Sequence, residues 1–343
     1  MEMLIGGTWR PAASGRAEDV TSPFDGTVVG TVPVAGAADA RAALDRAEHG
    51  AVTWRRTPAF ERMKILMRAA ELADERAEQT AQIISAEAGK SITEARGEAS
   101  RSGDLIRLAA FEGTQLYGDT LPLDANRGTG LDKLGFTIRQ PVGIVVAITP
   151  FNYPALLVMH KLAPALAAGN AVVLKPARTT PLTALALALA RCFTDAGLPD
   201  GVLSVVTGPG AGNGPGNGPG NGQGLGDALV TDPRVRKVSF TGSTATGQRI
   251  TQLAGIKKLS LEQANGTPYG LGAGLFTSDV AGAVRAIREI DAGNVHINWT
   301  PLWRADLMPY GGLKASGIGQ EGPRSAVAEM TDVKTVILHG RPW

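Results

Sequence analysis

The sequence predicts an α/β protein built on a doubly wound parallel sheet, and two patterns in its middle section carry that prediction. From Gly143 onwards, short apolar runs alternate with helix-like segments four times. Runs such as VGIVVAI at 142–148 have the length of a strand and no polar alternation, as expected of a strand buried on both faces. Strands that alternate with helices form a parallel sheet covered by helices on both sides. Ligands of such sheets bind at the carboxyl ends of the strands.

The part of the chain before the sheet is predicted to contain two kinds of element. Residues 1–35 are short extended pieces and hairpins broken by Gly and Pro. Ala-rich amphipathic segments follow, and over 61–89 apolar residues recur every three or four positions, which places them on one helix face. A further helix is predicted from Ser91 to about Tyr117, where Gly97 and Gly103 weaken the helical pattern.

The remaining elements follow in order along the chain. Buried strands are predicted at 142–148, 170–177, 201–208, 234–242 and 257–262. The helices between them are predicted at 154–169, 179–197 and 243–255. Beyond residue 268 we expect a strand at 269–277, a helix at 279–293, a strand at 294–300, a short helix at about 321–330 and a final strand at 332–340.

One segment interrupts this alternation. Residues 209–226 repeat the letters GNGP and contain no apolar side chain larger than that of Ala211 or of the prolines before Leu225. Such a segment cannot offset its ordering entropy by burial, so we predict a flexible surface loop. It contains no strict G-x-G-x-x-G pattern, which disfavours a phosphate-binding loop.

Composition narrows the possible partners and compartment. The net charge is +2 with both signs interspersed, which argues against a nucleic-acid-binding surface. The longest apolar runs are strand-sized and no secretion signal stands out, so we expect a cytoplasmic protein without a membrane partner. The four histidines lack metal-ligand spacing, and we predict no metal site. The one cysteine, Cys192, lies in an apolar helical segment and is predicted to be a small buried side chain.

Three polar stretches follow predicted strands and are candidates for chemistry. In ITPFNYP, Asn152 either offers its amide to a developing oxyanion or simply forms a turn. In LKPAR, Lys175 and Arg178 either face a dinucleotide at the strand-end crevice or are solvated surface cations. In TGSTATG at 241–247, hydroxyl groups and a helix N-terminus form either a pyrophosphate site or an ordinary N-cap.

Five stretches taken together resemble the aldehyde dehydrogenase superfamily. They are PVGIVVAITPFNYP, AGNAVVLKPA, SFTGSTATG, KLSLE and PYGGLKASGIGQEGP, and they occur in this order over nearly the whole chain apart from the GNGP repeat. The resemblance implies a Rossmann-like cofactor domain, a catalytic domain and an oligomerisation arm. It also implies oxidation of an aldehyde to a carboxylic acid through a cysteine thiolate, with NAD⁺ or NADP⁺ as hydride acceptor.

The resemblance assigns roles to individual residues. Asn152 looks like the oxyanion-hole amide, Lys175 like the contact to the cofactor ribose, and Gly242 with Ser243 like the pyrophosphate contact. Arg178 stands where many NAD-preferring members carry Glu, and a cation there attracts a 2′-phosphate, so NADP is favoured over NAD. The full set assigned to the cofactor is Ile148, Thr149, Pro150, Phe151, Lys175, Ala177, Arg178, Thr241, Gly242, Ser243 and Gly247. The C-terminal motif resembles the lactaldehyde, phosphonoacetaldehyde and non-phosphorylating glyceraldehyde-phosphate branch, in which Arg304 is a candidate for binding an anionic substrate.

The resemblance also exposes a gap. The stretch LSLEQANGTPYGLGAG at 259–274 passes directly from a cofactor-domain motif to a much later part of the family. The family's Gly-Gln-x-Cys motif with the nucleophile and its Glu-x-Phe-Gly-Pro motif are both absent from the sequence, and Cys192 lies outside the nucleophile's motif. We therefore expect an internal deletion of most of the catalytic domain. Glu262 is either the family's general base or part of the downstream piece.

The expected domains follow from this junction. Residues 1–130 and 142–262 form the cofactor domain, 263–330 are a remnant of the catalytic domain, and 131–141 with 331–343 are the strands of an oligomerisation arm. Three interpretations remain open: an aldehyde dehydrogenase with an impaired or inactive site, a non-catalytic nucleotide-binding or subunit-interaction protein, and a deletion product that folds poorly. We expect a homo-oligomer, with a small aldehyde as the partner of an active site. In the second interpretation the arm pairs either with a second copy of this chain or with an intact homologue.

Overall fold

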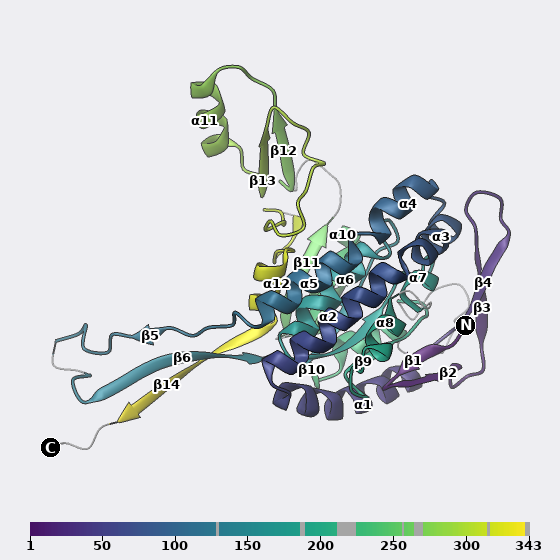
Figure 1. Ribbon diagram of the computed structural model, residues 1–343, viewed down its shortest axis with the longest axis horizontal. Coiled ribbons are helices and arrows are strands. Elements are labelled where there is room, and N and C mark those ends of the chain that lie inside the picture. The colour runs from purple at the N-terminus through teal and green to yellow at the C-terminus, as the bar shows by residue number, and fades with distance from the viewer. Residues whose placement is uncertain are drawn as a thin grey trace.

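The computed structural model describes residues 1–127, 130–185, 189–210, 224–255, 257–263, 270–313 and 316–339. It confirms the predicted α/β architecture, because a seven-stranded sheet lies at the centre with helices on both faces (Figure 1). The strand order is β11-β10-β7-β8-β9-β1-β2. The parallel strands are β7 (Ile144–Ile148), β8 (Ala171–Lys175), β9 (Leu203–Val205), β10 (Val235–Gly242) and β11 (Lys258–Gln263).

The N-terminal strands contribute more than the sequence indicated. The hairpin of β1 (Met3–Ile5) and β2 (Thr8–Arg10) joins the main sheet, because β1 pairs antiparallel with β9 through Leu4 and Val205. Three-residue strands carry too little pattern to reveal such a partner from sequence. The second hairpin, β3 (Ala17–Thr21) with β4 (Val28–Pro33), forms a separate two-stranded sheet.

Two helical layers enclose the sheet. On one face α6 (Leu156–Ala167) contacts β7 and β8, and α2 (Ala59–Glu75) and α5 (Ser102–Gly113) pack over α6. On the other face lie α1 (Ala37–Arg56), α9 (Leu225–Thr231) and α10 (Thr244–Ala254). The shorter helices are α3 (Ala77–Ala88), α4 (Ile92–Ala99), α7 (Leu182–Leu185), α8 (Ala190–Asp195) and α12 (Pro323–Glu329).

The sheet and α6 form the centre of the core because most of their residues are apolar and buried. Strand β7 is buried from Ile144 to Ala147, β8 is buried throughout, and all but one residue of α6 is buried. Trp54 of α1 is fully buried, and its indole Nε1 donates a 2.8 Å hydrogen bond to the carbonyl of Leu166. This bond ties a helix on one face to the end of α6 on the other.

Three predicted boundaries are wrong in detail. The helix predicted over 91–117 is divided into α4 and α5 and ends at Gly113, and the pattern over 61–89 breaks at Arg76 between α2 and α3. The loop predicted over 209–226 falls mainly on 211–223, which lie outside the described residues. Its end is incorrect because α9 begins at Leu225, where Leu225, Leu229 and Val230 are buried against the core.

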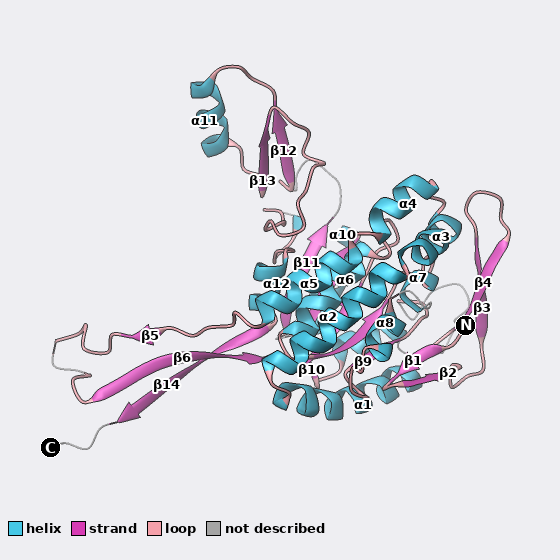
Figure 2. Cartoon of the chain, viewed as in Figure 1, coloured by secondary structure: helices cyan, strands magenta, loops and turns pink. Residues whose placement is uncertain are grey.

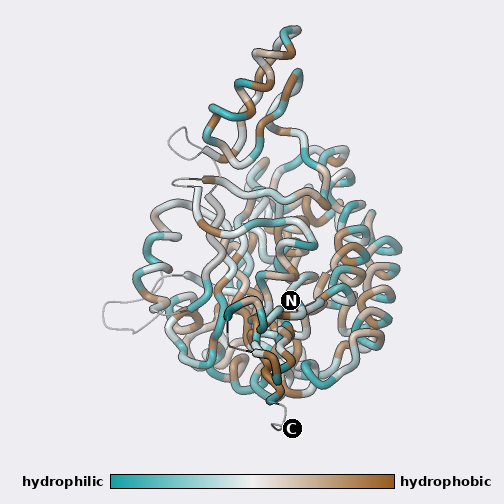
Figure 3. Tube along the Cα trace, turned by 90° about the vertical axis from the view of Figure 1, so that its left-hand side faces the viewer, coloured by the Kyte–Doolittle hydropathy of each residue, from teal (hydrophilic) through white to brown (hydrophobic). Residues whose placement is uncertain are grey.

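Two parts of the chain extend from this body. Strands β6 (Lys133–Pro141) and β14 (Thr331–His339) pair antiparallel over nine residues and, with β5 (Thr120–Leu121), form an arm that projects sideways (Figure 2). Strands β12 (Gly272–Leu275) and β13 (Asn294–Ile297) are parallel and joined through α11 (Val280–Glu289), as the sequence predicted. This β12–α11–β13 unit stands apart from the body at the top of Figure 3. None of the residues of α11 is buried.

Candidate active site at the carboxyl edge of the sheet

The strand order creates a crevice where the predicted site residues lie. Strands β7 and β10 are neighbours, and the helices that follow them, α6 and α10, lie on opposite faces of the sheet. Such a switch point is the usual place for ligands in doubly wound sheets. In the ladder Ile148 pairs with Lys175 on one side and with Phe240 on the other, and Thr241 pairs with Glu262. The structure therefore gathers residues from all three predicted stretches, together with Glu262, at one edge.

The loop between β7 and α6, which carries Asn152, is anchored from below. The buried carboxylate of Glu98 accepts hydrogen bonds from the backbone N–H groups of Ala155, at 2.8 Å, and Leu156, at 3.1 Å. Lys90 pairs with Glu98 at 2.7 Å, and its Nζ lies 3.7 Å from the centre of the Tyr153 ring. Asn152 itself is exposed. The anchoring residues were not found from sequence, because α4 carries Glu98 in a charged segment typical of a surface helix.

Lys175 is buried, so its interpretation as a solvated surface cation is wrong. It is the last residue of β8 and is 6% exposed, and its Nζ donates to the carbonyl of Pro176 at 3.3 Å. Burial lowers the pKa of this ammonium to about 8, because desolvation disfavours the charged form.

Arg178 is fixed by an ion pair, although it is more exposed than Lys175. Its Nε and Nη2 donate to the two carboxylate oxygens of Glu18 on β3 at 2.6–3.1 Å. This bidentate pair raises the pKa of Arg178. Arg178 and Glu18 line a cavity of about 590 Å³ together with Phe151 and Thr180.

The turn between β10 and α10 contains the predicted N-cap, and its role as a pyrophosphate site stays a prediction. Ser243 is the N-cap of α10, and its hydroxyl accepts a hydrogen bond from the backbone N–H of Thr246 at 3.4 Å. The first turn of α10 still presents backbone N–H groups and the positive end of the helix dipole. Gly242 is required here, since a Cβ at this position would lie 2.6 Å from the Phe240 ring.

A buried polar cluster lies beneath this turn. Lys161 of α6 donates from Nζ to the hydroxyl of Thr241 at 2.5 Å and lies 3.6 Å from a carboxylate oxygen of Glu321. Glu321 also pairs with Arg304, whose guanidinium stacks on the Tyr310 ring at 4.3 Å. Arg304 is thus engaged with Glu321 rather than open to a substrate.

His160 lies at the side of this cluster. Its Nδ1 is 3.5 Å from Nη2 of Arg304, and burial lowers the pKa of the imidazole to about 4. Neither Lys161 nor Glu321 was predicted from the sequence. A lysine inside an otherwise apolar helix was the available signal for the former, because a charge is buried only when it has partners.

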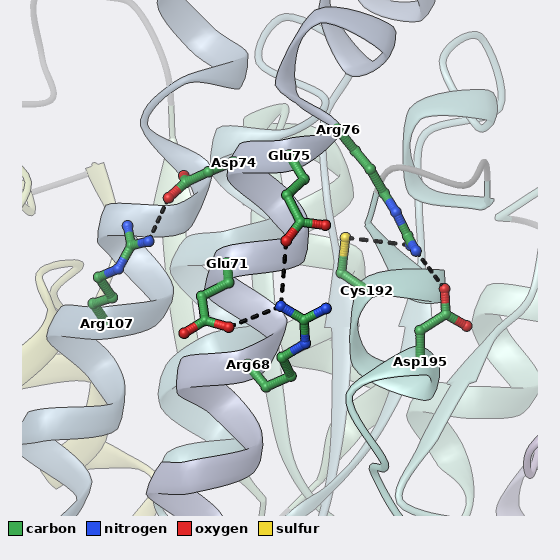
Figure 4. A network of polar contacts seen from close by, with 8 residues as sticks. All are labelled: Arg68, Glu71, Asp74, Glu75, Arg76, Arg107, Cys192 and Asp195. Carbon is green, nitrogen blue, oxygen red and sulfur yellow. Dashed lines mark hydrogen bonds and ion pairs between the residues drawn. The ribbon is translucent and has the colours of Figure 1, made fainter.

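The single cysteine lies outside the carboxyl edge. Cys192 is on α8, fully buried, with its Sγ 3.8 Å from a guanidinium nitrogen of Arg76, which also pairs with Asp195 at 2.6 Å (Figure 4). Burial raises the pKa of the thiol to about 11 despite the neighbouring cation. The prediction that Cys192 is a small buried side chain is confirmed.

Two buried hydroxyl groups at this edge have no hydrogen-bond partner among the described residues. The hydroxyl oxygens of Thr149, directly after β7, and of Thr180, after β8, are buried without a hydrogen-bond partner within the described part of the chain. Native proteins satisfy most buried polar atoms, so these hydroxyls fit a polar ligand such as a dinucleotide. No helix among the described residues is long and apolar enough to cross a membrane.

Comparison with known proteins agrees with this geometry. The family model described as "Aldehyde dehydrogenase family" matches residues 9–264 and again 260–336. Succinate-semialdehyde dehydrogenase [NADP(+)] of Escherichia coli (strain K12) is 41% identical over 270 residues, which are 78% of this chain and 52% of that protein. The chain thus spans about half the length of this relative. The 3-sulfolactaldehyde dehydrogenase of Priestia aryabhattai is 30% identical over 427 aligned residues, covering 82% of this chain and 86% of the relative.

The length of that second alignment shows that the relative has aligned positions that this chain lacks. The covered 82% of 343 residues is about 281 residues, so about 146 of the 427 aligned positions have no counterpart in this chain. The two matched parts of the family model meet at 260–264.

Solved structures show the same fold. An NADP-dependent enzyme of E. coli superposes with a TM-score of 0.89 at 27% identity, over 98% of both chains. An aldehyde dehydrogenase from Brucella melitensis biovar abortus 2308 superposes with a TM-score of 0.90 at 25% identity, over 99% of this chain and 98% of that one. A doubly wound sheet with its polar crevice at the switch point, family matches over most of the sequence and these superpositions together show that the chain belongs to the aldehyde dehydrogenase family.

Proposed function

We propose that this chain binds NADP⁺ or NAD⁺ at the carboxyl edge of its sheet but has an impaired or inactive site for aldehyde oxidation. The observation that carries the proposal is Cys192, the only cysteine, which is fully buried on α8 with its thiol pKa raised to about 11. Covalent catalysis requires a thiolate positioned at the substrate. The absence of about 146 family positions near residues 260–264 removes the segment in which the resemblance places that nucleophile.

The residues that remain are those expected to hold the cofactor, which when bound supplies a hydride acceptor. Lys175 offers a donor to the ribose hydroxyls, the first turn of α10 after Ser243 receives the pyrophosphate, and Thr149 and Thr180 offer hydroxyls without internal partners. NADP is favoured over NAD by the cation Arg178. The E. coli relative, which is named as an NADP(+) succinate-semialdehyde dehydrogenase, supports the same choice.

Asn152 and Glu262, which the resemblance assigns to catalysis, are both present in this chain, whereas the nucleophilic cysteine is not. Asn152 is exposed on an anchored loop, as an oxyanion-binding amide requires. Glu262 belongs to β11, in register with Thr241, which supports its assignment to the cofactor domain rather than to the downstream piece. Without a thiolate neither residue has a covalent intermediate to stabilise or hydrolyse.

Binding and turnover test the two halves of the proposal separately. We expect NADP⁺, and more weakly NAD⁺, to raise the melting temperature of the purified chain in a saturable manner, because a ligand of the native state stabilises it. Oxidation of succinate semialdehyde, followed by nicotinamide absorbance, should fall far below that of the complete E. coli relative assayed in parallel. A flat thermal response contradicts cofactor binding, and turnover comparable to the relative contradicts the loss of activity.

The arm favours subunit association as a second function. Strands β6 and β14 project from the body (Figure 1). They carry exposed apolar side chains on both faces of the ladder, with the paired Leu134 and Leu338 on one face and Val333 on the other. An exposed apolar surface of this kind is typical of an interface. We expect a discrete homo-oligomer peak in gel filtration, and replacement of Val333 and Leu338 by Ser should shift it towards the monomer. A monomer peak for the unmodified chain contradicts this function, whereas a broad void-volume peak indicates the poorly folding alternative.

A further inference from the structure

The Arg178 guanidinium is the most strongly tethered group at the carboxyl edge. Glu18 reaches it from β3, far away in the sequence, and accepts three contacts of 3.1, 2.9 and 2.6 Å from Nε and Nη2. The side chain of Glu18 is 19% exposed and that of Arg178 is 46% exposed, so the carboxylate is the more enclosed partner. A fork geometry of this kind fixes the plane of the guanidinium as well as its position.

The pair changes what Arg178 can offer to an anion. A guanidinium has five N–H donors, and Glu18 engages the Nε edge, so the donors of Nη1 remain available. The carboxylate also places a negative charge beside the cation. A phosphate that binds the open side of Arg178 is therefore attracted by the guanidinium and repelled, at a somewhat longer distance, by Glu18.

No other acidic residue of the cavity has this relation to Arg178. The carboxylate of Asp19, the next residue on β3, accepts a 2.9 Å hydrogen bond from the hydroxyl of Thr31 on β4. Glu87 directs its carboxylate to the backbone N–H groups of Leu182 and Thr183 at 2.7 and 2.9 Å.

We propose that Glu18 is a specificity-determining residue, which holds Arg178 in place and offsets its charge, and thereby reduces the preference for NADP⁺ over NAD⁺. The inference rests on the proposed binding of a dinucleotide at this edge. Arg178 selects the 2′-phosphate, and Glu18 limits how strongly it does so. The chain is accordingly expected to accept both cofactors with a modest preference for NADP⁺.

The experiment compares the affinities of the full-length chain for NADP⁺ and NAD⁺ by isothermal titration calorimetry, which needs no catalytic activity. E18Q keeps the shape of the side chain and an acceptor oxygen but removes the charge. We expect it to raise the ratio of NADP⁺ to NAD⁺ affinity about tenfold, as loss of a like charge near a phosphate predicts. D19N is the matched control, since it removes a charge from the adjacent residue that does not contact Arg178, and it should leave the ratio nearly unchanged.

The dependence on Arg178 is tested with R178Q. This variant should lose the preference for NADP⁺, and adding E18Q to it should leave the ratio where R178Q put it. An unchanged or lowered ratio in E18Q, with both cofactors still bound, overturns the role of Glu18 and leaves the proposed function standing. Failure of the unmodified chain to bind either cofactor overturns both. An equal rise in D19N and E18Q also contradicts the inference, because it shows a general effect of net charge.

Discussion

The buried ammonium of Lys175 predicts that cofactor affinity falls as the pH rises from 7 to 9. With a pKa of about 8 in the free protein, the group is about 90% protonated at pH 7 and about 10% protonated at pH 9. If only the ammonium form donates to the ribose, the apparent dissociation constant rises about tenfold over this interval. Between about pH 8 and pH 10.5, the lowered and the ordinary pKa of this group, Lys175 binds fewer protons in the folded state than in the unfolded state. Lys175 by itself therefore makes the ligand-free chain more stable as the pH rises through this range.

The dissociation constant is measured by calorimetric titration with NAD⁺ at pH 7 and pH 9. NAD⁺ is chosen because it has no 2′-phosphate, whose own ionisation changes with pH. K175Q should bind more weakly at pH 7 and should show little further loss at pH 9. K64Q, which removes an exposed lysine of α2, is the control and should retain the tenfold dependence of the unmodified chain. Equal affinities at pH 7 and pH 9 for the unmodified chain would refute the reasoning, because they would show that the charge of Lys175 does not take part in binding.

Three further perturbations test other parts of the structure. R304M removes the ion-pair partner at 2.5 Å from the buried carboxylate of Glu321 and should lower the free energy of unfolding, measured by urea titration, by about 3 kcal/mol. R324M, the control, breaks an exposed ion pair and should lower it by less than about 0.5 kcal/mol. Similar losses in the two variants would contradict the importance of burial. V280E places a charge on the exposed apolar face of α11, where Val280 is 77% exposed. If the chain self-associates through this face, the variant should scatter less light in solution without a lower melting temperature. Unchanged light scattering would exclude this face from self-association. The thiol of Cys192 should react with an aromatic disulfide reagent only on unfolding, since it is buried with a pKa of about 11, and rapid reaction of the native chain would contradict that environment.

The parallel sheet was predictable because its strands carry the signal themselves. The apolar runs ending at Ile148 and Lys175 have no polar alternation, and only a strand covered on both faces tolerates that pattern. Since parallel strands share their carboxyl edge, placing the strands also placed Lys175, Arg178 and Ser243 together. Their roles in cofactor binding stay predictions.

The remaining features depend on contacts that no local pattern encodes. The antiparallel addition of β1 to β9 joins residues about two hundred positions apart through one paired residue on each strand. Glu18 reaches Arg178 across 160 positions from a hairpin that reads as an ordinary surface element. The cluster around Lys161 is assembled from α6, β10 and the C-terminal region, and only the lone lysine in an apolar helix hinted at it.

The position of the junction explains how the sheet persists without the missing segment. Strand β11 is the last strand at its side of the main sheet, and its pairing with β10 runs in register up to Gln263. Most of the buried hydrophobic side chains that the structure describes lie at or before Ala254, in the part of the chain that precedes the junction, and α12 adds Ala326 and Val327. The C-terminal segment instead attaches through polar contacts, such as Arg101 with Asp306 and Lys161 with Glu321, and through the packing of α12 on α5 and α6. The proposed loss of sequence after β11 therefore leaves the pairing of the main sheet in place, and no residue of α11 is buried. On the proposed function, cofactor binding and aldehyde oxidation are separable in this chain, because the residues proposed for the first lie around the buried sheet and the resemblance places the nucleophile for the second in the segment that we propose is absent.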